Sequence, residues 1–119
     1  MRGPYLFKKI AFIGTYLPRK CGIATFTSDL YHSVTQEAPE LNGLVVALND
    51  TPDGYPYPEE VKFEVAQNNQ DYYRQLAEFL NMTRVDLTCL QHEFGIFGGP
   101  AGGHILVTLR RLRMPIVTT

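Results

Sequence analysis

Short continuous apolar runs along the chain alternate with segments in which apolar residues recur at helical spacing. The runs at 10–13, 44–48 and 87–90 are mainly aliphatic. Such runs are typical of strands covered on both faces, as in a parallel sheet with helices on each side. We therefore predict buried strands at these three places, a further strand at 61–65 and a last one beginning at Met114.

Three segments between these runs carry apolar residues three and four positions apart, the spacing of one face of an α-helix. The first helix is expected to end near Pro39, with Asn42-Gly43 making the next turn. Arg110, Arg111 and Arg113 fall in the last turn of the third helix, where cations suit the helix dipole. The predicted stripes are Ile23, Phe26, Leu30 and Val34; Tyr72, Leu76, Phe79 and Leu80; and Ile105, Leu109 and Leu112.

The segment 50–58 is too rich in Pro and Gly for regular structure and too compact for a helical crossover. The strand at 61–65 is therefore expected to be antiparallel or at an edge. Tyr55 and Tyr57 either line a sugar-binding surface or pack against this loop. The alternation as a whole predicts one α/β domain over 1–119, a Rossmann-like open, mainly parallel sheet with helices on both faces.

The first strand leads through Gly14 and a basic loop into the first helix. Backbone N–H groups at that helix start, with Arg19 and Lys20, favour phosphate or another anion. The spacing of Gly14 and Gly22 fits neither G-x-G-x-x-G nor G-x-x-x-x-G-K-[ST], which disfavours dinucleotide dehydrogenases and P-loop NTPases. An alternative is that Gly22 merely permits a tight entry into the helix.

A second glycine-rich loop, 92–104, follows the strand at 87–90 and is expected to open at the same edge. His92 stands where sites form in such sheets, and is either functional or a histidine hydrogen-bonded within its loop. Glu93 is either a base or a loop cap. Ile96 occupies the place of the second histidine of H-E-x-x-H, and His92 with His104 lacks a third ligand nearby, so no metal site is expected.

The chain has 119 residues with 11 basic and 12 acidic side chains, a balance that argues against nucleic-acid binding through bulk charge. No stretch approaches the roughly 20 apolar residues of a membrane span. The two cysteines, Cys21 and Cys89, do not suggest a disulfide framework, and we expect a reducing, cytoplasmic setting. Arg19 and Lys20 would favour the thiolate of Cys21. A small α/β enzyme centred on Cys21 or His92 is therefore one rival interpretation.

The segments Phe12–Phe26 and Leu90–Gly99 together resemble the amino-terminal half of bacterial family-four, or group 1, glycosyltransferases of the GT-B fold. The resemblance runs through the chain in order to Thr119. It implies a Rossmann-like domain that binds mainly the acceptor of a sugar transferred from a nucleotide-sugar with retention of configuration. It also implies that the first loop approaches the donor diphosphate.

Carried over residue by residue, the resemblance places Gly22, Ile23 and Ala24 near the diphosphate and Arg19 at the acceptor or a phosphate. His92 would lie in the acceptor cleft as the catalytic candidate. The second loop would contribute the remaining donor- or acceptor-binding positions, which are Glu93, Gly95, Gly98 and Gly99. No DxD metal motif is present, in keeping with metal-independent chemistry that uses the nucleotide-sugar as substrate and no cofactor.

The donor-binding half of such enzymes, with its basic pair and E-x7-E pattern, is not in these residues. The resemblance therefore implies a carboxyl-terminal partner domain and a carbohydrate or glycoconjugate acceptor. Because a leaving diphosphate must be surrounded from both sides, the chain is expected to be inactive alone. The alternative is a non-catalytic Rossmann-like module that binds an anionic ligand or a protein partner.

Overall fold

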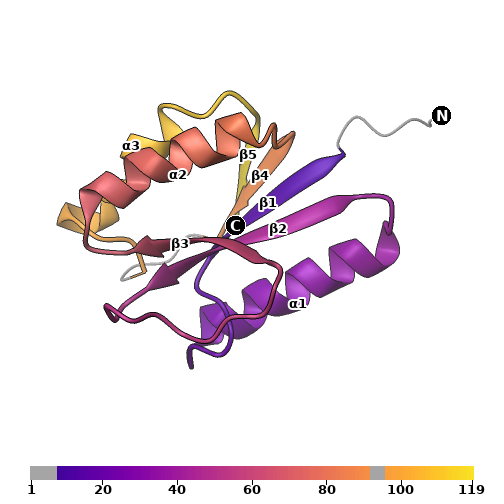
Figure 1. The fold of residues 1–119 in the computed structure, drawn as a ribbon, viewed down its shortest axis with the longest axis horizontal. Coiled ribbons are helices and arrows are strands. Elements are labelled where there is room, and N and C mark those ends of the chain that lie inside the picture. Colours follow the sequence, from indigo (N-terminus) through magenta and orange to yellow (C-terminus); the bar gives the residue numbers. More distant parts are fainter. Residues whose placement is uncertain (1–7, 92–95) are drawn as a thin grey trace.

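The computed structural model describes residues 8–91 and 96–119, which form one five-stranded sheet (Figure 1). The strands lie in the order β3-β2-β1-β4-β5, and all their pairings are parallel. The predicted Rossmann-like α/β sheet is thereby confirmed. The strands are β1 (Lys9–Gly14), β2 (Asn42–Asn49), β3 (Val61–Ala66), β4 (Leu87–Leu90) and β5 (Ile116–Thr118).

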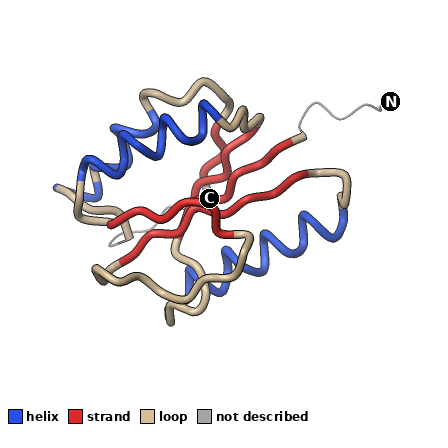
Figure 2. Tube along the Cα trace, in the orientation of Figure 1, coloured by secondary structure: helices blue, strands red, loops and turns tan. Residues whose placement is uncertain are grey.

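Helices lie on both faces of the sheet. Helix α1 (Gly22–Glu37) covers one face, and α2 (Gln70–Met82) and α3 (His104–Leu109) lie on the other (Figure 1). A single 3₁₀ turn, Pro100–Gly102, precedes α3. Figure 2 shows the connection between β2 and β3 as loop throughout, on the same side of the sheet as α1.

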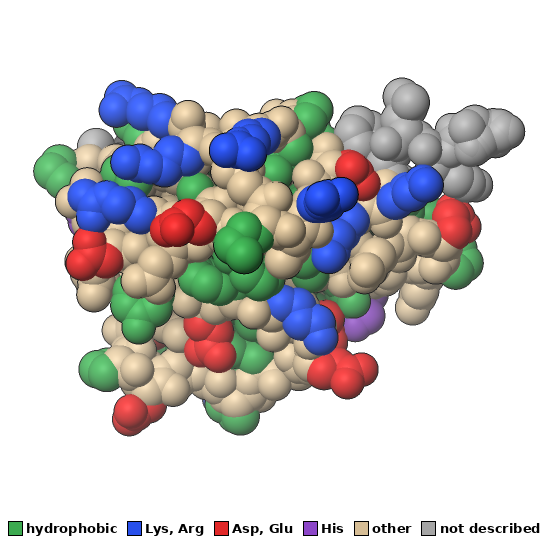
Figure 3. All heavy atoms as spheres, turned by 45° about the horizontal axis from the view of Figure 1, so that its top comes forward, with side chains coloured by type: hydrophobic (Ala, Val, Ile, Leu, Met, Phe, Trp, Pro, Cys, Tyr) green, Lys and Arg blue, Asp and Glu red, His purple; other side chains and the backbone are tan. Residues whose placement is uncertain are grey.

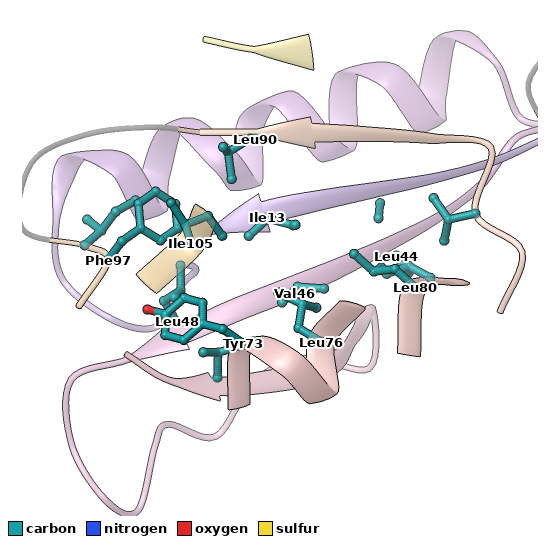
Figure 4. Close-up of a cluster of buried hydrophobic side chains, with 14 residues drawn as sticks. Ile13, Leu44, Val46, Leu48, Tyr73, Leu76, Leu80, Leu90, Phe97 and Ile105 are labelled. Carbon is teal, nitrogen blue, oxygen red and sulfur yellow. The ribbon is translucent and has the colours of Figure 1, made fainter. Parts of the chain in front are cut away.

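Successive side chains of the central strands point to opposite faces of the sheet, so these strands contribute to two hydrophobic cores. On the α2 side, Ile13, Val46 and Leu48 pack with Tyr73 and Leu76 (Figure 4). The smaller core, on the α1 side, joins Phe12 and Val45 to partly buried residues of α1 such as Leu30 and Tyr31. The aliphatic runs predicted as buried strands fall within β1, β2 and β4. The runs in β1 and β2 are buried on both faces, whereas in β4 only Thr88 and Leu90 are buried and Leu87 and Cys89 are partly exposed.

Two residues assigned to buried helix faces point outward instead. Phe26 is 50% exposed, because it lies about 200° around α1 from Ala24, which faces the sheet. Tyr72 is 37% exposed, and its neighbour Tyr73 is fully buried. In α2 the buried stripe is Tyr73, Leu76, Ala77 and Leu80, one residue away from the predicted start.

The strand expected at 61–65 is an edge strand, as predicted, but the antiparallel alternative is wrong. β3 pairs parallel with β2, from Val45 opposite Val61 to Asn49 opposite Ala66. The segment between them returns to the amino edge as extended chain, which needs fewer residues than a helix to cover the same distance.

The turn predicted at Asn42-Gly43 is misplaced. Asn42 and Gly43 already pair with β1, and the turn lies at Ala38–Leu41.

Helix α3 ends earlier than its apolar stripe suggested, at Leu109, and Arg110 is its carboxyl-terminal cap. Arg111 lies beyond the helix and donates from Nη1 to the Val107 carbonyl at 3.0 Å, which satisfies one acceptor of the last turn. On the face shown in Figure 3, basic and acidic side chains are interspersed among apolar ones.

Candidate functional site

The strand order reverses between β1 and β4, which is the switch point where ligands bind in open α/β sheets. The Gln91 amide donates to the Ile13 carbonyl at 2.9 Å, so the chain leaves both strands side by side. The described parts of the two glycine-rich loops therefore start from the same carboxyl edge, as predicted.

Helix α1 begins at this edge with amide groups that have no intrahelical acceptor. Cys21 is its N-cap, and Sγ accepts from the Ala24 amide at 3.4 Å and contacts Thr15 Oγ1 at 3.1 Å. The amides of Gly22 and Ile23 remain at the helix start. Ala24 itself is fully buried with its amide held by Cys21, so a direct diphosphate contact from Ala24 stays a prediction that the geometry does not favour.

Gly22 is exposed, and a Cβ added there would meet no atom of residues 8–91 and 96–119 within 4 Å. Its φ also lies outside the left-handed range that favours glycine. Within the described residues, neither steric crowding nor backbone conformation therefore requires glycine at the entry to α1. No described side chain or backbone atom fills the space where a Cβ of residue 22 would stand, next to the amides of the helix start.

Arg19 is held inside the protein rather than directed at solvent. Its Nη1 donates to the Leu48 carbonyl at 2.8 Å and to Gln67 Oε1 at 3.2 Å, and Nη2 lies 3.6 Å from the Asp50 carboxylate. Only 12% of its side chain is exposed. Arg19 thus ties the β1–α1 loop to the ends of β2 and β3, and its predicted contact with acceptor or phosphate stays a prediction.

Asp50 balances part of the Arg19 charge. The Tyr55 hydroxyl donates to Asp50 Oδ1 at 2.6 Å, and this hydrogen bond, followed by Arg19, lowers the pKa of Asp50. Tyr57 donates to Asn49 Oδ1, so both tyrosine hydroxyls of this loop are engaged within the protein. Of the two interpretations of these tyrosines, the described contacts match the packing one.

A pocket of about 340 Å³ lies beside Arg19 at the ends of β2 and β3. Most of the residues that line it carry carboxylate, hydroxyl or amide groups, although most of its lining surface is apolar. The side chains that provide these groups are Asn49, Asp50, Thr51, Gln67, Asn68 and Asn69.

The predicted residues His92, Glu93 and Gly95 lie outside the described residues. Gly98 and Gly99 are described, and packing accounts for both. A Cβ on Gly98 would lie 2.0 Å from the Gln67 carbonyl oxygen. Gly99 has φ of +85° and lies against the His104 ring. Their binding roles stay predictions.

Tyr73 joins the second loop to the end of β3. Its hydroxyl donates to the Gln67 carbonyl at 2.7 Å and accepts from the Gly98 amide at 3.1 Å. His104 packs against the Tyr73 ring at 5.6 Å between centroids. Among residues 8–91 and 96–119, no three or more His, Cys, Asp or Glu side chains are grouped so that they could hold a metal ion.

Gln91 is a residue that the sequence analysis missed. It is 2% exposed, its Oε1 accepts from Thr119 Oγ1 at 2.7 Å, and its Nε2 has no hydrogen-bond partner in the described part of the chain. Gly14 lies between Gln91 and Thr27 of α1, since a Cβ there would meet both side chains. The sequence did carry a signal for Gln91, which is a polar residue directly after the apolar run of a strand.

No protein-family model, curated protein or solved structure matches the chain. None of the helices in the described segments is both long enough and apolar enough to span a bilayer.

Proposed function

We propose that this chain is the acceptor-binding half of a retaining glycosyltransferase that uses a nucleotide-sugar, with the donor-binding half supplied by a second domain. The single observation that carries the proposal is Gly22, an exposed helix-entry glycine at the switch point of the sheet, where no described atom would lie within 4 Å of an added Cβ. The sequence resemblance supplies the reaction class.

In the reaction, the bond between the anomeric carbon and the donor diphosphate breaks, and a bond from that carbon to an acceptor hydroxyl forms. The leaving diphosphate gains negative charge as this bond breaks. The amides of Gly22 and Ile23 and the positive end of the α1 dipole would stabilise that charge. The absence of a side chain at Gly22 lets phosphate oxygens come within hydrogen-bond distance of the backbone.

The acceptor would lie in the pocket at the ends of β2 and β3. Its apolar surface can pack against a sugar ring, and amide groups such as those of Asn68 and Asn69 can bond sugar hydroxyls. Arg19 would act as a positioning residue, because it holds the first loop against Leu48 and Gln67.

The test is calorimetric binding of inorganic pyrophosphate to the 119-residue chain and to a Gly22→Asp variant. α1 has no acidic residue in its first turn, so Asp at position 22 should stabilise the helix and raise the melting temperature. The same charge should repel pyrophosphate and weaken binding roughly fivefold or more at an ionic strength of about 0.1 M. A variant that is more stable but binds pyrophosphate more weakly shows that position 22 acts in ligand binding and not in folding.

Ser33→Asp is the matched control, because it adds the same charge to an exposed position about 16 Å further along α1. It should change pyrophosphate binding less than twofold, an expectation that follows from screening beyond a Debye length. Equal effects of the two variants, or no pyrophosphate binding at all, would overturn the proposal. Tight binding by this chain alone would favour the alternative, a free-standing module for anionic ligands.

A further inference from the structure

A second groove, of about 550 Å³, lies on the α1 side of the sheet. The β1–α1 loop forms one wall, α1 another, and the connection from β2 to β3 the third. Four apolar residues line it, and none of them is buried. Three of the four are prolines, whose rings make this part of the lining rigid. The four residues are Leu17, Pro18, Pro56 and Pro58.

The acidic group of this groove is Glu60, whose side chain is 15% exposed. Tyr16 donates from its hydroxyl to Glu60 Oε2 at 2.7 Å. Burial, followed by the hydrogen bond to Glu60, raises the pKa of Tyr16, so the phenol keeps its proton and continues to donate. The Glu60 carboxylate is thereby fixed in position and retains further acceptor capacity.

His32 presents a second acceptor to the same space. Its Nδ1 lies 2.8 Å from the Ser28 carbonyl oxygen and 3.4 Å from Ser28 Oγ. The carbonyl only accepts, so the shorter contact is a hydrogen bond in the neutral tautomer that carries its proton on Nδ1. In that tautomer the lone pair is on Nε2, which lies 3.8 Å from Glu60 Oε2, and neither of these two atoms can donate to the other.

The lining offers no basic side chain that could donate to both atoms. No lysine or arginine is found among the described residues that line the groove. An ammonium group carries three donors and a positive charge, so it can bond both acceptors at once. A small apolar body attached to it would rest on the leucine and proline rim.

We propose that this groove binds a small organic ammonium ion, with its N–H groups donating to Glu60 Oε2 and His32 Nε2. The site is separate from the proposed diphosphate site and does not depend on transfer activity. It would add recognition of an amine-bearing ligand to a domain whose other candidate site suits anions.

The probe is cyclohexylammonium, titrated into the isotope-labelled chain and followed by NMR, with neutral cyclohexanol as its isostere. Cyclohexylammonium should shift the His32 ring resonances, and cyclohexanol should bind roughly tenfold more weakly because it lacks the charge. Glu60→Gln keeps an acceptor for Tyr16 but removes the charge, and should weaken ammonium binding by a similar factor. Glu59→Gln is the matched control, with an expected change below about twofold, since Glu59 is an exposed neighbour outside the lining.

Two results would overturn the proposal: equal binding of the alcohol and the amine, or equal effects of Glu59→Gln and Glu60→Gln. Circular dichroism of each variant checks that the fold is intact. Pyrophosphate binding is also measured in the presence of cyclohexylammonium. Because the two sites are separate, failure of one ligand to bind counts against its own site and leaves the other proposal standing.

Discussion

The two glycine-rich loops leave neighbouring strands, yet their glycines stand in opposite surroundings. Gly22, in the first loop, has no atom of the described residues within 4 Å of where a Cβ would stand. Gly98, in the second, would place a Cβ 2.0 Å from the Gln67 carbonyl oxygen. Packing requires glycine at position 98, whereas no described contact requires it at position 22.

The difference separates two meanings of glycine near a binding edge. At Gly98 the missing side chain lets two segments of the protein approach each other, and the Tyr73 hydroxyl bonds both of them. At Gly22 the missing side chain leaves helix amides accessible from outside. The described part of the second loop therefore has a structural role, and the first loop is the better candidate for ligand contact.

The largest expected effect comes from the pair Gly98→Ala and Gly22→Ala. Gly98→Ala forces the loop away from Gln67 and should lower the free energy of unfolding by about 3 kcal/mol or more. Gly22→Ala should raise it by about 0.5 kcal/mol, because alanine has the higher helix propensity. Urea unfolding followed by circular dichroism measures both. Similar losses in the two variants would erase the contrast between the loops.

A smaller effect should follow removal of the hydroxyl that holds the second loop. Tyr73→Phe leaves the Gly98 amide and the Gln67 carbonyl without this partner, and should cost about 2 kcal/mol of unfolding free energy. Tyr72→Phe removes a hydroxyl from the exposed neighbour and should change stability by less than about 0.5 kcal/mol. If both variants are equally stable, the hydroxyl of Tyr73 does not fasten the loop.

Alkaline pH should loosen the same attachment. Burial raises the pKa of Tyr73, so its stabilising contribution is fully present below the unfolded-state tyrosine pKa and is lost as pH rises towards the higher folded-state pKa. Above pH of about 10, each such tyrosine should reduce the unfolding free energy by up to about 1.4 kcal/mol per pH unit. Unfolding curves at several alkaline pH values should be less steeply pH-dependent for Tyr73→Phe than for Tyr72→Phe. Parallel pH profiles would contradict the assignment.

Local patterns in the sequence were enough to predict the sheet and its class. The runs at 10–13, 44–48 and 87–90 are strands, and the first two are buried on both faces, where no polar alternation obscures the pattern. In the third, Leu87 and Cys89 are only partly buried. The direction of β3 was not readable, since a link without a helix is compatible with either direction until tertiary packing selects one. Phe26 and Tyr72 show the same limit on helices, where several faces carry apolar residues.

The candidate site was only partly predictable, for a related reason. The position of α1 at the carboxyl edge follows from the order of elements, whereas the partners of Arg19 come from β2 and the end of β3. Tyr73 with Gly98, and His32 with Glu60, are likewise pairs distant in sequence. No spacing rule connects such residues before the sheet assembles them. His92, Glu93 and Gly95 remain predictions.

β1 lies in the middle of the sheet, with β2 and β4 as parallel neighbours that share its backbone hydrogen bonds. Among the described strands, β3 and β5 each pair on one side only. Amide hydrogens exchange with solvent where hydrogen bonds open locally, and edge strands open before central ones. Deuterium would therefore enter this sheet from both edges and reach β1 last, so the strand that leads into the α1 amides belongs to the slowest-exchanging part of the molecule.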